Sequence, residues 1–282
     1  MKRILGLLLC FVFSVVLFAC GGASEYDEMM KEINSVAREN QFIVGLECAY
    51  QPFNWTEDKK TETNYPISNI DSKFAEGYDI QIAKKIANKL GKTLVIKAVD
   101  WDALIPSLDT QNIDAIIAGM SNTEERRKSV LFTNAYYTSE EVCIVLKDGK
   151  YKDAQSINDF EGANAIGQKG TLYADLVTQL TNANVGTPLE TVPQIITAMM
   201  NGRCDVTVVE KPVALGLVNS NPELKLIEFE GENGFNVSLE DVAVCIALRL
   251  TDEALVNEIN EILDDITVEE REALMATAVS QN

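Results

Sequence analysis

Strand-like and helix-like segments alternate along this chain, and they do so in two successive rounds. In the first round, the apolar, strand-like residues 41–55 and 93–99 flank residues 77–92, whose apolar side chains recur at helical spacing. Residues 113–119 are again strand-like, and a second round follows over residues 165–210. This alternation predicts an α/β fold in which mostly parallel sheets are flanked by helices.

A short pattern recurs at the end of each round. Asp114 stands five residues before Gly119 in SLDTQNIDAIIAG, and Asp205 stands five residues before Glu210 in AMMNGRCDVTVVE. This repeated spacing predicts that Gly119 and Glu210 lie just beyond the carboxyl ends of equivalent strands. The alternative is that the repeat is only the general similarity that any two α/β segments share. Because open α/β sheets bind ligands at such strand ends, two lobes of this kind would form a binding cleft between them.

The first residues have the features of an export signal. Two basic residues precede the unbroken apolar residues 4–18, a run that is short for a membrane span. The run leads into Cys20 in a setting that resembles a lipobox, which predicts a signal peptide over residues 1–19, a lipidated Cys20 and a tether over residues 20–40. The alternative is an ordinary secretory signal cleaved near Ala23.

The charge and the missing residue types exclude several kinds of function. The chain has 24 basic and 43 acidic residues, a formal net charge of −19, which argues against nucleic acid as a partner because phosphate binding needs a basic surface. It contains no histidine, which excludes histidine-dependent zinc sites and histidine-based catalytic triads. We expect neither a metal nor a cofactor.

The cysteines beyond the export segment match no metal-binding spacing; they are Cys48, Cys143, Cys204 and Cys245. We expect them to be buried free thiols. A disulfide between Cys143 and Cys245 is the alternative, since an exported protein meets oxidising surroundings.

Two segments have the composition of an anion site. In GMSNTEERRKSV, residues of the N-cap type predict a helix that starts near Thr123, with Arg126 one turn in and Ser121 just before it. Free backbone N–H groups, a hydroxyl and a guanidinium together favour a carboxylate. Thr171 stands at a second turn into a helix. The alternative is a capped surface helix whose arginines are solvated.

Other residues suggest a cation site and a specificity pocket. Glu210 at a strand end can receive an ammonium group, or else it is an exposed acid at the start of a helix. Tyr50 and Trp101 can clamp a ligand side chain or belong to the core, and Phe53 is expected to be core. Glu47 is an acid in an otherwise apolar strand, either a charge at the sheet edge or the group that selects a polar ligand tip.

Four separated segments together resemble the extracellular solute-binding proteins of amino-acid ABC importers. In chain order they are GYDIQIAKKIANKLG, DWDALIPSLDTQNIDAIIAGMSNTEERRKSVLFTNAYYTSEEVCIVL, QKGTLYADL and GRCDVTVVEKPVA, and the resemblance extends over residues 41–280. It implies the type II periplasmic-binding-protein fold, two α/β lobes joined by two crossing strands. The first lobe would comprise residues 41–139 and 244–282, and the second residues 140–243.

The resemblance also implies how a free amino acid would be held. The α-carboxylate would meet Arg126, Ser121 and the backbone of Gly119, Thr171 and Leu172; the α-amino group would meet Glu210, Gly119 and Ser121; the side chain would lie between Tyr50 and Trp101 and face Glu47. Glu210 stands where the family usually has Asp, and the loop of residues 54–73 is longer than is common.

The function implied is the capture of a basic or polar amino acid, such as arginine, lysine, histidine or glutamine, by a monomeric lipoprotein outside the membrane. Closure of the cleft around the ligand would present it to an ABC permease. The alternative is a cleft enzyme of the cyclohexadienyl dehydratase kind, in which Glu47 or Glu210 would be the general acid. A sensor lobe of a signalling receptor is a third reading.

Overall fold

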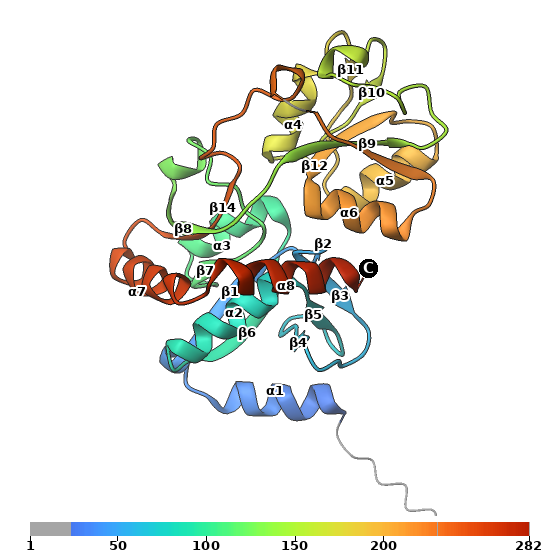
Figure 1. The fold of residues 1–282 in the computed structure, drawn as a ribbon. Coiled ribbons are helices and arrows are strands. Elements are labelled where there is room, and N and C mark those ends of the chain that lie inside the picture. The colour runs from blue at the N-terminus through green and yellow to red at the C-terminus, as the bar shows by residue number, and fades with distance from the viewer. Residues whose placement is uncertain (1–23, 230, 282) are drawn as a thin grey trace, which may run out of the picture.

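The structure, a computed structural model, describes residues 24–229 and 231–281 and has two sheet-rich lobes, one above the other in Figure 1. Each lobe is built on a five-stranded sheet with helices packed against it. The predicted signal peptide, residues 1–19, and the predicted lipidation site, Cys20, lie outside the described residues. No helix within the described ranges combines the length and the apolar character that a bilayer crossing needs.

The two five-stranded sheets share one plan. In each, the first three strands in spatial order run parallel and the last two pairings are antiparallel. In spatial order the first sheet consists of β6 (Thr93–Ala98), β1 (Gln41–Leu46), β7 (Ala115–Ile116), β14 (Ala243–Arg249) and β8 (Val130–Thr138). The second consists of β11 (Asn184–Val185), β10 (Asn164–Ala165), β12 (Val206–Glu210), β9 (Glu141–Leu146) and β13 (Leu224–Ile227).

The sheets are therefore mixed, whereas the alternation of segments predicted mostly parallel ones. The difference comes from β9 and β14, which run antiparallel to both of their neighbours. These are the strands through which the chain enters the second sheet after β8 and returns to the first sheet after β13. The upper and lower lobes in Figure 1 are joined by these two passages.

Helices cover the faces of both sheets. Around the first sheet are α1 (Glu25–Ser35), α2 (Tyr78–Lys89), α3 (Leu104–Asp109), α7 (Glu253–Asp264) and α8 (Val268–Ser280), and around the second are α4 (Leu172–Leu176), α5 (Val192–Met200) and α6 (Lys211–Ser220). Single turns of 3-10 helix are η1 (Arg38–Asn40), η2 (Trp101–Ala103), η3 (Arg126–Lys128), η4 (Ile157–Asp159), η5 (Val177–Gln179) and η6 (Gly231–Asn233). The apolar faces of the helices pack against the sheets, and one buried cluster extends through both lobes while a second lies within the second lobe.

A small antiparallel sheet in the first lobe includes two short strands from the long loop expected over residues 54–73. Its spatial order is β2 (Ala49–Tyr50), β3 (Asn54–Glu57), β5 (Phe74–Glu76) and β4 (Tyr65–Pro66). Helix α1 packs beside it through the buried Tyr26, whose hydroxyl donates to the carbonyls of Ile67 and Ile70 at 2.9 and 3.1 Å. The predicted tether therefore contains a short helix, as its polar, helix-prone residues favour, and this helix is docked on the first lobe.

The predicted equivalence of two strands is confirmed, because β7 and β12 are each the third strand of their sheet. The backbone N–H of Asp114 donates to the Ile43 carbonyl at 2.7 Å, and its carboxylate accepts the Ile43 N–H at 2.9 Å. Asp205 makes the same two contacts with Asn164, at 2.7 and 2.8 Å. Each aspartate thus fixes the register of a parallel strand pair.

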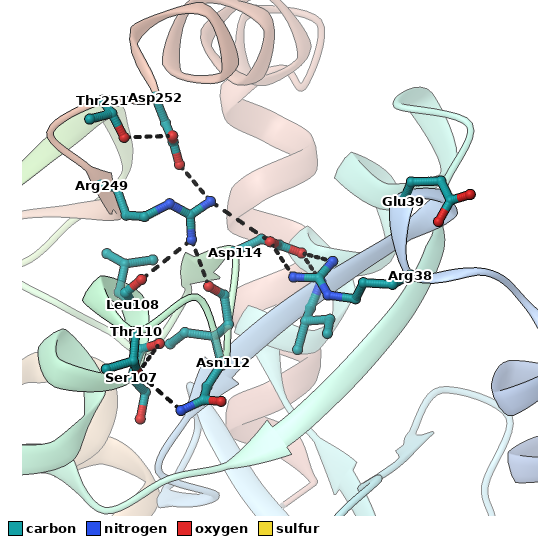
Figure 2. A network of polar contacts seen from close by, with 12 residues as sticks. Arg38, Glu39, Ser107, Leu108, Thr110, Asn112, Asp114, Arg249, Thr251 and Asp252 are labelled. Carbon is teal, nitrogen blue, oxygen red and sulfur yellow. Dashed lines mark hydrogen bonds and ion pairs between the residues drawn. The ribbon is translucent and has the colours of Figure 1, made fainter.

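Asp114 is in addition the centre of a charge network in the first lobe (Figure 2). Arg38 donates two hydrogen bonds to the Asp114 carboxylate, at 2.7 and 3.0 Å. Arg249 lies 3.8 Å from the same carboxylate and pairs with Asp252 at 2.7 Å. The network ties the segment before β1 to the start of β7 and the end of β14.

We expect Asp114→Ala to lower the free energy of unfolding by about 2–3 kcal/mol, because it leaves two arginines and a strand N–H without their partner. Urea denaturation at neutral pH measures the loss. Asp205→Ala is the matched control, since within the described ranges the Asp205 carboxylate accepts hydrogen bonds from Asn164 alone, and the loss of stability in this variant should be smaller. Equal losses in the two variants would contradict a stabilising role for the arginines.

Candidate functional site

A small cavity lies between the two lobes. The first lobe contributes Glu47, Tyr50, Trp101, Gly119, Ser121 and Arg126, and the second contributes Gln168, Thr171 and Tyr173. Most of the residues predicted from the sequence thus come together around one space. Leu172 and Glu210 are not on its wall: Leu172 packs against the core of the second lobe, and Glu210 is buried at the end of β12.

Arg126 reaches across the cavity from the first lobe to the second. Its guanidinium donates to the Ser121 carbonyl at 2.8 Å and to the Gly170 carbonyl at 3.1 Å, and it lies 5.1 Å from the centre of the Trp101 ring. Burial lowers the pKa of Arg126 to about 10. Because this value is still well above 7, the guanidinium is charged at neutral pH. A ligand carboxylate could accept the same N–H groups in a bidentate pair.

The helix predicted to start near Thr123 is only the single turn η3. The segment before it is fixed by a bridge between Ser121 and Val244, and β8 begins two residues after η3 ends, which leaves no length for a longer helix. The Thr123 hydroxyl still accepts the Arg126 N–H at 3.4 Å, as a cap would. The sequence was wrong about the helix and right about the place of the arginine beside Ser121.

Gly119 follows β7 in the left-handed conformation, with φ of 60°. A Cβ atom there would lie 3.2 Å from the Tyr50 ring, so glycine lets the ring pack on the backbone. The Gly119 N–H donates to the Tyr136 hydroxyl at 3.1 Å, and that hydroxyl donates to Asp79 at 2.7 Å. The N–H expected to serve a ligand is therefore already engaged, which leaves the Gly119 carbonyl as an acceptor.

Two aromatic side chains line the cavity from the first lobe. Tyr50 is buried and stacks on Phe53 with 5.6 Å between ring centres, and its hydroxyl has no hydrogen-bond partner among the residues that the structure describes. Phe53 is fully buried, which confirms it as core. Trp101 is partly exposed and donates its indole N–H to the Gly170 carbonyl at 3.0 Å. Both cavity rings can contact the apolar part of a ligand side chain.

Glu47 stands directly after β1 in acidic surroundings. Burial raises its pKa to about 7, the Gln168 amide opposes that rise, and the carboxylates of Asp100 and Glu190 add to it. The Gln168 amide contacts both Glu47 oxygens at 3.3 and 3.4 Å across the cavity. A cationic group beside Glu47 would relieve the repulsion among these acids.

Glu210 ends β12, buried to 1% exposure, and among residues 24–229 and 231–281 no side chain or backbone group is a hydrogen-bond partner of its carboxylate oxygens. Burial raises its pKa to about 8. A buried carboxylate without a partner is costly. The Glu210 carboxylate is therefore suited to accept hydrogen bonds from a cation. Tyr173 in helix α4 belongs to the wall of the cavity.

Sequence reasoning missed Gln168 and Tyr173 on the cavity wall. Both flank the turn that leads into α4, which the sequence did identify through Gly170 and Thr171. The Thr171 hydroxyl accepts the Tyr173 N–H at 3.2 Å and donates to the Gln168 carbonyl at 2.8 Å. This cap turns both side chains toward the first lobe; their polar character beside a predicted anion-binding turn was the signal available.

The two lobes also contact each other next to residues of the cavity wall. Lys169 of the second lobe pairs with Asp102 of the first at 2.7 Å. The Gly170 carbonyl accepts from both Trp101 and Arg126. The structure is thus a closed form, in which entry of a ligand requires the lobes to part.

The four cysteines expected to be free thiols do not line the cavity. The four described cysteines are buried and free, and Cys143 and Cys245 lie in different sheets, which confirms the free thiols. Within residues 24–229 and 231–281, no three Cys, Asp or Glu side chains converge as a metal site.

The chain matches known proteins over most of its length. The family model of the bacterial extracellular solute-binding proteins, family 3, matches residues 42–277. The probable histidine-binding protein of Campylobacter jejuni is 30% identical over 242 residues, which cover 85% of this chain and 87% of that protein. The arginine-binding extracellular protein ArtP of Bacillus subtilis is 26% identical over 272 residues, which cover 94% and 93%.

Solved structures show the same likeness. An amino acid ABC transporter substrate-binding protein from Streptococcus pneumoniae, AbpA bound to L-arginine, superimposes with a TM-score of 0.71 at 25% identity. The superposition covers 89% of this chain and 98% of that one.

Proposed function

Because the chain belongs to the bacterial extracellular solute-binding proteins of family 3, we propose that it binds a free L-amino acid outside the membrane and delivers it to an ABC permease. Its fold is that of the type II periplasmic binding proteins. The proposed lobes are residues 41–139 with 244–282, and residues 140–243. Since only the closed form lets both lobes contact a ligand, binding shifts the open–closed equilibrium toward closure, and the permease recognises the closed form.

The observation that carries this proposal is the pairing of unlike charges from opposite lobes. Arg126 of the first lobe supplies guanidinium N–H groups at the cavity. Glu210 of the second lobe supplies a carboxylate whose two oxygens have no hydrogen-bond partner in the described part of the chain. A free amino acid carries one group for each, its α-carboxylate and its α-ammonium. Charge-assisted hydrogen bonds contribute about 1.5–3 kcal/mol each, so a few of them reach micromolar affinity.

We propose that Ser121 and Thr171 line the carboxylate end and that the Gly119 carbonyl assists Glu210 at the ammonium end. Leu172, which the resemblance implies as a backbone contact, begins α4 just after the Thr171 cap. Tyr50 and Trp101 flank the ligand side chain. The roles of Ser121, Thr171, Gly119, Tyr50 and Trp101 follow the wall of the cavity, and Gln168 and Tyr173 are further wall residues. Glu210 and Leu172 lie off this wall, and their roles follow from the resemblance.

The acids around Glu47 favour a ligand with a cationic side chain. Asp100 and Glu190 add negative potential at Glu47, which a guanidinium, an ammonium or an imidazolium would neutralise. Relatives of the chain are named for histidine, arginine and glutamine. The acids around Glu47 place arginine, lysine and histidine ahead of glutamine.

Titration calorimetry against the twenty amino acids tests the function. We expect micromolar or tighter binding by at least one basic amino acid and weaker binding by glutamine. Absence of heat with all twenty amino acids would overturn the proposal, and turnover of a cyclohexadienyl acid would replace it with the enzymatic alternative. The relatives named above are binding proteins, and we propose binding without turnover.

Glu47→Gln is expected to weaken the binding of L-arginine about 10- to 100-fold, because the guanidinium loses a charged partner. Binding of L-glutamine should change much less, since a neutral amide gains little from the charge. Competition between the two ligands in one calorimetric titration measures the change in preference. An equal loss for both ligands would contradict a role of Glu47 in side-chain selection.

The family is extracellular, and we propose a lipid anchor at Cys20, on the outer side of the cytoplasmic membrane, with the body of the protein monomeric. Mass spectrometry of the mature N-terminal peptide tests the anchor. A diacylglyceryl group on Cys20 is expected; a free N-terminus near Ala23 would favour the ordinary signal.

A further inference from the structure

Gln168 lies where the two lobes meet at Glu47, and its backbone is fixed on both sides. The next residue, Lys169, donates its N–H to the Leu189 carbonyl at 2.8 Å, and the Gln168 carbonyl accepts from the Thr171 hydroxyl at 2.8 Å. The Gln168 side chain is 3% exposed and belongs to the wall of the cavity. Gln168 is therefore a buried polar residue whose position is set by its own lobe, the second.

The hydrogen bonds of the Gln168 amide fix which way it faces. Its Nε2 atom donates to the Glu190 carbonyl at 3.0 Å and contacts both carboxylate oxygens of Glu47 at 3.3 and 3.4 Å. All three partners are acceptors, so a flipped amide would set its own Oε1 atom against three oxygens. Both N–H groups are thus in use, one within the second lobe and one across the cleft to the first.

This arrangement leaves oxygen acceptors available on both lobes. Within residues 24–229 and 231–281, no group donates a hydrogen bond to the Gln168 Oε1 atom, and the Glu47 carboxylate accepts from Gln168 alone. A carboxylate has about four lone-pair positions, so Glu47 can accept from a ligand as well. The indole N–H of Trp101, another wall residue, is engaged by the Gly170 carbonyl. An ionised Glu47 and Gln168 therefore offer a ligand acceptors only, one group from each lobe.

A guanidinium fits two neighbouring acceptor groups better than the other side-chain tips do. It is planar and holds five N–H donors in a fixed fork, so that it can donate to a carboxylate and to an amide carbonyl together. An ammonium is a compact, strongly hydrated point charge with three donors on one atom. An amide or urea tip brings a carbonyl of its own, which would face the oxygens of Glu47 and Gln168. The chemistry of this residue pair therefore favours a guanidinium.

We propose that Gln168 is a specificity-determining residue, which holds Glu47 from the opposite lobe and accepts a hydrogen bond from the guanidinium of L-arginine through its side-chain carbonyl. This inference rests on the proposed function and narrows its ligands, because it makes L-arginine preferred over L-lysine. Since Glu47 belongs to the first lobe and Gln168 to the second, the guanidinium meets both acceptors only in the closed form. The choice between arginine and lysine is therefore made on closure.

Calorimetry with the wild-type protein tests this preference without any substitution. We compare L-arginine, L-lysine and L-citrulline, which has the shape of arginine but a neutral urea tip, at pH 8. This pH lies above the value of about 7 to which burial raises the pKa of Glu47. We expect arginine to bind about 10-fold more tightly than lysine and about 100-fold more tightly than citrulline. Binding of lysine or citrulline as tight as that of arginine would overturn the inference and leave the proposed function standing.

Gln168→Met removes the amide and keeps the length of the side chain. We expect arginine to lose about 10-fold in affinity and lysine much less, so that the preference nearly disappears. A residue that only supported Glu47 would weaken both ligands equally, and that result would overturn the inference. Gln194→Met is the matched control, because Gln194 is an exposed glutamine of the second lobe outside the cavity wall. The preference of this control for arginine should equal that of wild type.

Thermal unfolding checks that both variants are folded. If Gln168→Met does not fold, the comparison of the three ligands in wild type decides the inference. Absence of heat with all twenty amino acids would overturn the proposed function and, with it, this inference. Tight binding of lysine and absence of binding are different results, so the two failures are distinguishable.

Discussion

Arg126→Ala is expected to weaken amino-acid binding by about 100-fold or more, because it removes the charged partner of the ligand carboxylate in a closed cleft. The guanidinium also joins the lobes through the Gly170 carbonyl, so its loss should reduce closure as well. Calorimetry measures the affinity, and far-ultraviolet circular dichroism together with urea denaturation shows whether the fold is intact.

Arg127→Ala is the matched control for this variant. Arg127 is the next residue in the chain and also carries a guanidinium, but it contacts Asn122 at 2.6 Å and Glu240 at 3.4 Å, away from the cavity. Its affinity should remain close to that of wild type. Unchanged binding in Arg126→Ala, or equal losses in both variants, would contradict the assignment of the carboxylate to Arg126.

Glu210→Gln is expected to weaken binding by about 100-fold, since the α-ammonium would then face an amide instead of a buried carboxylate. The variant should also be more stable than wild type when empty at pH 8. The reason is that burial raises the pKa of this acid to about 8, and an ionised, unpartnered carboxylate destabilises the closed form. Calorimetry and thermal unfolding on the same sample measure both effects.

The two effects of Glu210→Gln have opposite signs, which separates a binding role from a structural one. A residue that only supported the fold would lose stability and affinity together. Retained affinity would contradict the ammonium assignment, and lower stability at pH 8 would contradict the account of the unpartnered acid. Glu228→Gln, which removes an acid that pairs with Lys211 on the surface, should change neither by much.

The general plan of the fold was predictable because it depends on local patterns. The equivalence of β7 and β12 followed from two aspartates at the same distance from Gly119 and Glu210, and both aspartates hold the same strand contacts. The mixed character of the sheets was not predictable in this way. It depends on the direction in which β9 and β14 cross, and no local pattern in either strand encodes that direction.

The position of a cavity residue was predictable where a charged or polar residue stands in the segment that follows a predicted strand. Glu47 follows β1 in this way, and Ser121 and Arg126 follow β7. It was not predictable where contacts join distant parts of the chain. The engagement of the Gly119 N–H requires Tyr136 and Asp79 to meet in the core. The contact between Gln168 and Glu47 likewise joins residues of different lobes.

A crystal structure of the protein with L-arginine bound is the most direct test of how the two lobes hold their ligand. We expect the α-carboxylate within hydrogen-bond distance of the Arg126 guanidinium and the α-ammonium at Glu210, with the side chain between Tyr50 and Trp101. An arginine bound in the reverse direction, or bound outside the cavity between the lobes, would contradict the account.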